Sequence, residues 1–178
     1  SMSTPLVAGA ATLTRQYLIE RKNISQPSAA LLKATMLHHA VDIFPGQYGE
    51  VGVARGQELA TRRPNSDEGY GRVDVAQIVQ PTKSSQFVDS KVGLSQGESK
   101  EFTVLVTHGK LLANLVWTDA PGSPNASAAL VNDLDLKVKK VDGTVVSMND
   151  KINNAEIVEL SNVPNGTYTI IVSAAKVP

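Results

Sequence analysis

The first part of the chain repeats apolar side chains with the period of an α-helix. Between residues 4 and 19 they recur at intervals of three and four positions, which predicts a helix with one apolar face. A polar segment at 20–23 ends this pattern, and a second stripe with the same spacing runs from 28 to 41. Pro5 and Pro27 each stand near the first turn of one predicted helix, where the missing N–H group costs nothing. We therefore expect two amphipathic helices at the start of the chain.

The helical period is lost after the second stripe. Residues 44–67 contain several glycines and prolines and no sustained pattern, so we expect a long surface loop. Asp74 then precedes a short apolar run at 75–79, where its carboxylate can cap a helix by accepting a backbone N–H. The polar segment 81–85 breaks the pattern again, and we place there the boundary between two domains, residues 1–80 and 85–178.

Beyond this boundary the pattern changes to short alternating segments. Apolar and polar side chains alternate most clearly at 100–107, 111–118, 134–141 and 166–173, which predicts β-strands. Gly, Pro and Asn stand between these segments, as is typical of turns between antiparallel strands. Trp117 is expected in the core of the resulting sheets. The predicted fold class is α+β, with a helical portion followed by an antiparallel β-sandwich.

The charge balance and the residue composition narrow the classes of function. The chain has 17 Lys and Arg residues against 17 Asp and Glu residues, so it lacks the basic excess of proteins that bind nucleic acids or anionic membranes. No apolar run reaches the roughly 20 residues of a membrane-spanning helix. The absence of cysteine excludes disulfides and thiolate metal sites without identifying a cellular compartment. We therefore expect neither a nucleic-acid partner nor a membrane partner.

Candidate chemistry lies at the start of the chain, which reads Ser1-Met2-Ser3-Thr4-Pro5 and continues with Leu6-Val7-Ala8-Gly9. This segment resembles the motif around the nucleophilic serine of subtilisin-like serine proteases, Gly-Thr-Ser-Met-Ser/Ala-x-Pro-x-Val-Ala-Gly, without its first two residues. The resemblance implies that Ser1 is a nucleophile that attacks a polypeptide substrate and forms an acyl-enzyme. Ser1-Met2 also fits the remnant of a cleaved expression tag, and the sequence leaves that alternative open.

Later segments extend the resemblance in the same order along the chain. Gly69-Tyr70-Gly71-Arg72-Val73 is similar to the segment that closes the subtilisin-like catalytic domain. The runs at 115–121, 130–136 and 166–169 resemble the jelly-roll-like C-terminal domain of one branch of these proteases. The resemblance implies that residues 1–80 are the C-terminal portion of a peptidase domain and that 85–178 form an accessory β-sandwich. It also implies a secreted, extracellular protein.

The resemblance places the other two catalytic residues outside this chain. In subtilisin-like proteases the chain order is Asp, His, Ser, so both partners of Ser1 would precede it. We therefore interpret His38 and His39 as structural residues at a helix end and expect the chain alone to be inactive.

Partners and an alternative function follow from this interpretation. The apolar stripes of the two helices would be covered either by the missing upstream part of the peptidase domain or by a second copy of the chain. A different class of function is also open, in which the β-sandwich is a non-catalytic stabilising or binding module of a secreted protein.

An oxygen-rich cluster in the second domain raises the question of a metal ion. Calcium is bound by carboxylate and carbonyl oxygens, and some members of the resembling family carry structural calcium, so Asp119, Asp133 and Asp135 are candidate ligands, with Asn132 beside them. The alternation of Asp133 and Asp135 with leucines also fits an ordinary strand with one solvated face. No cofactor is required for the chemistry, and calcium would be structural.

Overall fold

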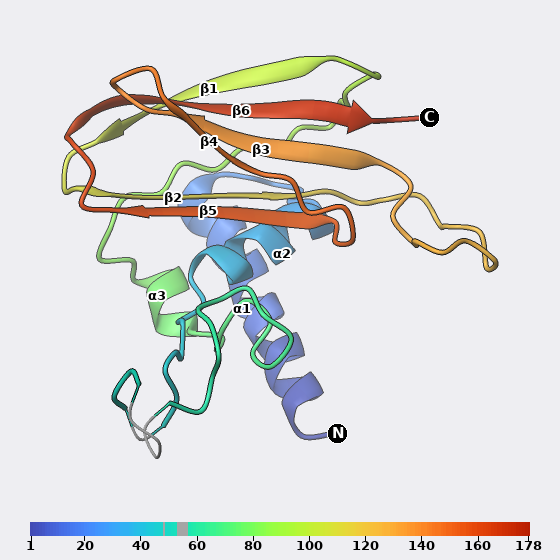
Figure 1. The fold of residues 1–178 in the computed structure, drawn as a ribbon. Coiled ribbons are helices and arrows are strands. Elements are labelled where there is room, and N and C mark those ends of the chain that lie inside the picture. Colours follow the sequence, from blue (N-terminus) through green and yellow to red (C-terminus); the bar gives the residue numbers. More distant parts are fainter. Residues whose placement is uncertain (48, 53–56) are drawn as a thin grey trace. The chain divides into compact units, whose positions relative to one another are not determined.

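The computed structural model describes residues 1–47, 49–52 and 57–178, and these form two units. The first unit comprises Ser1–Ser28 and Thr35–Ser85, and the second comprises Ala29–Ala34 and Gln86–Pro178. Strands occur in the second unit, which Figure 1 draws as two layers of arrows. Part of the loop expected at 44–67, including Gly56, lies outside the described residues. The division into domains at 81–85 stays a prediction.

Helix α1 spans Ser3–Lys22, so the first predicted helix is present and slightly longer than its pattern indicates. Its residues before Ala10 are exposed, and the buried ones are Ala10, Thr14, Tyr17 and Leu18. Helix α3, Val75–Val79, contacts α1 within the first unit. At the end of α1, Asn23 adopts a left-handed conformation with φ of 56° and donates its N–H to the carbonyl of Leu18. Asparagine tolerates this conformation better than most residues, which explains why the helix ends there.

Helix α2 spans Ala29–His38, so the second predicted helix is present and shorter than the stripe at 28–41. The segment between α2 and α3 is held by backbone pairing. Val41 and Arg72 exchange two hydrogen bonds of 2.8 and 2.9 Å between their main chains. Gly71, next to this pair, has a φ of 104°, and a Cβ atom there would lie 2.5 Å from the carbonyl oxygen of Val41. Only glycine fits such a position without displacing the backbone. The predicted cap is also present, because the Asp74 carboxylate accepts a 3.2 Å hydrogen bond from the backbone N–H of Gln77 in α3.

The second unit contains two antiparallel sheets. One has the strand order β1-β6-β3-β4 and the other pairs β2 with β5 (Figure 1). The strands are β1 (Ser99–Val106), β2 (Lys110–Val116), β3 (Asp133–Lys139), β4 (Val145–Met148), β5 (Ala155–Ser161) and β6 (Gly166–Lys176). The alternating segments of the sequence therefore predict β1, β2, β3 and β6 within a few residues.

Strands β4 and β5 are not predicted by the alternation of side chains. β4 has only 4 residues, which is too short for a period of two to be recognised. β5 begins with consecutive buried residues, from Ala155 to Val158, and Glu156 among them interrupts the apolar pattern. A strand that is buried on both faces lacks the alternation of a half-exposed strand.

Buried side chains from both sheets meet in one core. The four-stranded sheet contributes Val106, Leu136, Val138 and Tyr168, and the two-stranded sheet contributes Leu111, Ala113 and Val158. Two antiparallel sheets that pack their apolar faces together form a β-sandwich, so the expected α+β class with a sandwich is confirmed. Trp117 is 8% exposed, as predicted, and its Nε1 atom donates a 3.0 Å hydrogen bond to the carbonyl of Asn132.

Removing core volume is expected to destabilise the sandwich. Leu136 is 1% exposed in the core, so Leu136→Ala should lower the free energy of unfolding by about 2–5 kcal/mol. Leu105 on β1 is 67% exposed, and Leu105→Ala should change it by less than about 0.5 kcal/mol. Urea unfolding followed by the fluorescence of Trp117 measures both variants. Equal effects of the two substitutions would contradict the assignment of Leu136 to the core.

Candidate functional site

Ser1 lies immediately before the positive end of α1. It is exposed, and Met2 occupies the N-cap position without a side-chain hydrogen bond to the first turn. No acidic residue lies in the first turn of α1. The first N–H groups of a helix and its dipole favour negative charge nearby, so an anion formed close to Ser1 would be stabilised by α1.

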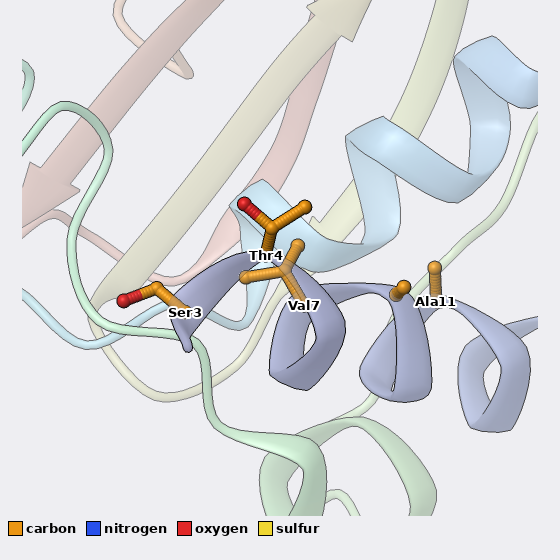
Figure 2. A pocket seen from close by; sticks show the side chains of 5 residues that line it. Ser3, Thr4, Val7 and Ala11 are labelled. Atoms are coloured by element: carbon orange, nitrogen blue, oxygen red, sulfur yellow. The ribbon is translucent and has the colours of Figure 1, made fainter. Parts of the chain in front are cut away.

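The first turns of α1 also line an open surface depression. Its lining residues share one side of the helix and are Ser3, Thr4, Val7, Ala8 and Ala11 (Figure 2). The two hydroxyl groups lie at the start of the helix, and small apolar side chains follow them. None of the five lining residues can act as a base near neutral pH. The depression therefore supplies no acid–base chemistry.

His38 and His39 lie far from Ser1. His39 is close enough to Lys22, the last residue of α1, for the lysine charge to affect its pKa. Burial is the main cause that lowers the pKa of His39, a hydrogen bond to the carbonyl of Thr35 opposes it, and Lys22 lowers it further. Because α1 has 20 residues and is about 30 Å long, His39 is near the end of α1 opposite Ser1. The ring of His38 lies 4.9 Å from that of His39, so neither histidine reaches Ser1.

Asp119 has a structural role in the second unit. Its carboxylate accepts hydrogen bonds from the backbone N–H groups of Ala120, Val131 and Asn132 and from the amide of Asn132, at 2.7–2.9 Å. Burial opposes ionisation of Asp119, but these hydrogen bonds outweigh it and hold its pKa below the usual value. Asp119 therefore closes the irregular segment between β2 and β3.

Asp133 and Asp135 lie on β3, opposite Lys176 and Ser173 of β6. The carboxylate of Asp135 is 3.6 Å from the Nζ atom of Lys137. One carboxylate oxygen of Asp133, Oδ1, is buried and has no hydrogen-bond partner among the described residues. The strand register shifts between Asp133 and Leu134, which sets Asp133 apart from the regular pairing that follows.

The candidate calcium ligands do not form a ready metal site. In the part of the chain that the structure describes, no three His, Cys, Asp or Glu residues are grouped so that they could hold a metal ion. The oxygens of Asp119 are already used by its own chain. Calcium binding by Asp119, Asp133 and Asp135 therefore stays a prediction, and we assign no chemistry to a metal.

Among the described residues, the acid with the most strongly perturbed pKa is Glu156, which the sequence does not predict. It is 1% exposed on β5, and its two carboxylate oxygens accept hydrogen bonds from the N–H groups of Leu136 (2.5 Å) and Asp150 (2.6 Å). Burial raises the pKa of Glu156 to about 7; the two N–H groups oppose this shift, and the charges of Asp135 and Asp133 add to it. No motif marks this residue, and only its polar character within an apolar segment could have drawn attention to it.

The comparisons with known proteins suggest that this chain is related to part of a longer, protease-related protein. No protein-family model matches the chain. Three proteins of Dictyostelium discoideum are similar to it, and each is named as a serine protease/ABC transporter B family protein. TagA is 26% identical over 96% of this chain, tagD is 25% identical over 88%, and tagB is 24% identical over 100%. The chain spans only 11% of the length of tagA and 12% of the other two.

The chain is thus similar, along nearly its whole length, to a small part of proteins that are named as serine proteases. Among the described residues, no helix has both the length and the apolar character that crossing a membrane requires. The part of this chain that is similar to tagA therefore includes both its helices and its β-sandwich.

The raised pKa of Glu156 predicts that the second unit is less stable at neutral than at mildly acidic pH. Below about pH 4.5 the folded and unfolded states are both protonated, so the residue adds no pH dependence. Between pH 4.5 and 7 the folded state keeps a proton that the unfolded state has lost. The free energy of unfolding should therefore fall with rising pH, by up to about 3 kcal/mol.

Glu156→Gln removes this titration, so the free energy of unfolding should depend less on pH. Glu159→Gln changes an exposed position of the same strand and should leave the pH dependence of the free energy of unfolding unchanged. Urea unfolding at pH 5 and 7.5 in the presence of EDTA, followed by Trp117 fluorescence, measures the difference. An unchanged slope in Glu156→Gln would show that this carboxyl group does not titrate in the range.

Proposed function

We propose that this chain is part of a subtilisin-like serine endopeptidase and that Ser1 is its nucleophile. The observation that carries the proposal is the motif from Ser1 to Gly9, which from Ser3 onward forms the first turns of helix α1. Two further observations support it. Ser1 is exposed next to the uncapped positive end of α1, and the similar proteins tagA, tagD and tagB carry serine protease in their names.

In this proposal the Oγ atom of Ser1 attacks the carbonyl carbon of a peptide bond. The new C–O bond forms an acyl-enzyme, the amine leaves with a proton, and water then releases the acid. The negative oxygen of the intermediate would lie near the N–H groups that begin α1, which are suited to stabilise it. The distance of about 30 Å along α1 removes His39 as the base. Because the chain order in subtilisin-like proteases is Asp, His, Ser, the proposal assigns the base and its orienting carboxylate to polypeptide that precedes Ser1.

The second unit is proposed to be an accessory β-sandwich of the same secreted peptidase. Its core is built from its own strands, which supports an independent stabilising role. The same feature favours an alternative in which the sandwich is a non-catalytic binding or stabilising module. The two functions are distinguished by whether Ser1 reacts.

A fluorophosphonate probe tests the nucleophile directly, because it labels serines that are activated by a base. A longer protein that contains this segment together with the preceding polypeptide should be labelled at Ser1. The isolated 178-residue chain should not be labelled, because in this proposal the base belongs to the preceding polypeptide. Peptide mapping by mass spectrometry identifies the modified residue.

Two variants of the longer protein serve as a matched pair. Ser1→Ala should abolish labelling, and Ser3→Ala should retain it, since the resembling motif accepts Ser or Ala at that position. Labelling of the longer protein at another serine, or of Ser1 in the isolated chain, would contradict the proposal. No labelling in a longer protein that cleaves peptides would point to a different nucleophile.

A further inference from the structure

Two segments of the second unit match the acceptor pattern for N-linked glycosylation, Asn-x-Ser/Thr with x other than proline. They are Asn125-Ala126-Ser127, between β2 and β3, and Asn165-Gly166-Thr167, at the start of β6. Short patterns of this kind also arise by chance, so the pattern alone does not identify a modified asparagine. The surroundings of the two asparagines differ, and this difference distinguishes the two segments.

The first of these segments lies in a loop whose two ends are held together. The carboxylate of Asp119, before the loop, accepts a 2.7 Å hydrogen bond from the backbone N–H of Val131, after it. Nearer the tip the two arms of the loop approach closely, because a Cβ atom on Gly122 would lie only 2.6 Å from the carbonyl oxygen of Ala129. The loop is therefore closed at its base, and residues 123–128 project from the end of the sandwich (Figure 1).

The tip of this loop presents Asn125 to solvent. Every residue from 123 to 129 is exposed. The N–H of Ala126 donates a 3.0 Å hydrogen bond to the carbonyl of Ser123, which closes a turn with Pro124 and Asn125 at its two central positions. Serine at the first position and proline at the second are typical of a β-turn. A large substituent on the Asn125 amide would therefore extend into solvent and displace no packed side chain.

Asn165 is part of the sheet. Its Oδ1 atom accepts a 3.3 Å hydrogen bond from the backbone N–H of Gly109, and Thr167, two residues further on, is paired with Leu105 between β6 and β1. A transferase must bind the asparagine and the hydroxyl group two residues later at the same time. An exposed loop tip allows this more readily than a strand that is already paired. The structure therefore favours Asn125 over Asn165 as an acceptor.

We propose that Asn125 is an attachment site for an N-linked oligosaccharide. The proposal rests on the proposed function, because attachment requires a protein that enters the secretory pathway. The donor is an oligosaccharide that is linked to a lipid pyrophosphate. The Nδ2 atom of Asn125 forms a bond to C1 of the first sugar, the lipid pyrophosphate leaves, and the amide gives up one proton to the transferase. The hydroxyl group of Ser127 completes the pattern that the transferase recognises.

Expression of the full 178-residue chain behind a cleavable secretion signal in eukaryotic cells tests the site. The chain should carry extra mass that peptide-N-glycosidase removes, and this enzyme should leave an aspartate at position 125, which peptide mapping by mass spectrometry identifies. Asn125→Gln and Ser127→Ala should each abolish the modification at this position, and Ser127→Thr should keep it. Ser123→Ala is the matched control, because it changes an exposed serine of the same loop outside the pattern and should keep the glycan.

An unmodified Asn125 in the expressed chain would overturn the proposal, as would a glycan on Asn165 alone. Occupancy of Asn125 supports the proposal whether or not Asn165 is also modified. Attachment accompanies entry into the secretory compartment, so chains retained in the cells are analysed with those in the medium, and a poorly folding variant still gives a result. The added signal directs the chain to this compartment whatever its native location. A glycan on the expressed chain that is absent from the protein of natural source would contradict the proposed secretion and not the acceptor site.

Discussion

The packing of the two antiparallel sheets against each other is the interaction on which the second unit depends. Leu136, Val138 and Tyr168 on one sheet meet Leu111 and Val158 on the other, and they are nearly or fully excluded from water. Glu156 lies two positions before Val158 on β5 and therefore on the same face of the strand, turned toward the other sheet, where its carboxylate accepts a hydrogen bond from the N–H of Leu136. The hydrophobic core therefore holds a carboxyl group whose pKa is raised to about 7, and the hydrogen bonds from Leu136 and Asp150 offset only part of the cost of its burial.

Polar side chains hold the irregular segments at the edge of the sandwich by hydrogen bonds. Asp119 closes the irregular segment between β2 and β3 by accepting hydrogen bonds from Val131 and Asn132. Asn114 and Asn154 then hold the first half of α2. These contacts cluster around Trp117, whose indole and backbone bond to Asn132 and Asn154. The edge of the sandwich is thus ordered by amide and carboxylate groups.

Periodicity predicts the elements that are half exposed and misses those that are not. Helix α1 and strands β1, β2, β3 and β6 follow from the spacing of their apolar residues, and Asp74 marks the start of α3. β5 is missed because consecutive positions are buried, and β4 because it is short. Glu156 could not be found in advance, since its pKa depends on burial and on Asp133 and Asp135, which are distant in sequence.

Ser1 could be proposed from sequence because its motif is local, and the structure adds its position before the uncapped end of α1. The depression lined by Ser3, Thr4 and Val7 supplies no base, and His38 and His39 lie near the other end of the helix. The chain therefore presents a candidate nucleophile and a positive helix end, and the proposed chemistry assigns the remaining groups to preceding polypeptide. That division of roles is physically consistent with the 11–12% of the relatives' length that the chain spans.

The most direct test of the central claim is kcat/KM for peptide hydrolysis by a longer protein that contains this segment, with and without Ser1→Ala. The account predicts a loss of about ten-thousand-fold or more, the scale expected when the nucleophile of a serine protease is removed. Activity within a few-fold of the unsubstituted protein would show that Ser1 is not the nucleophile.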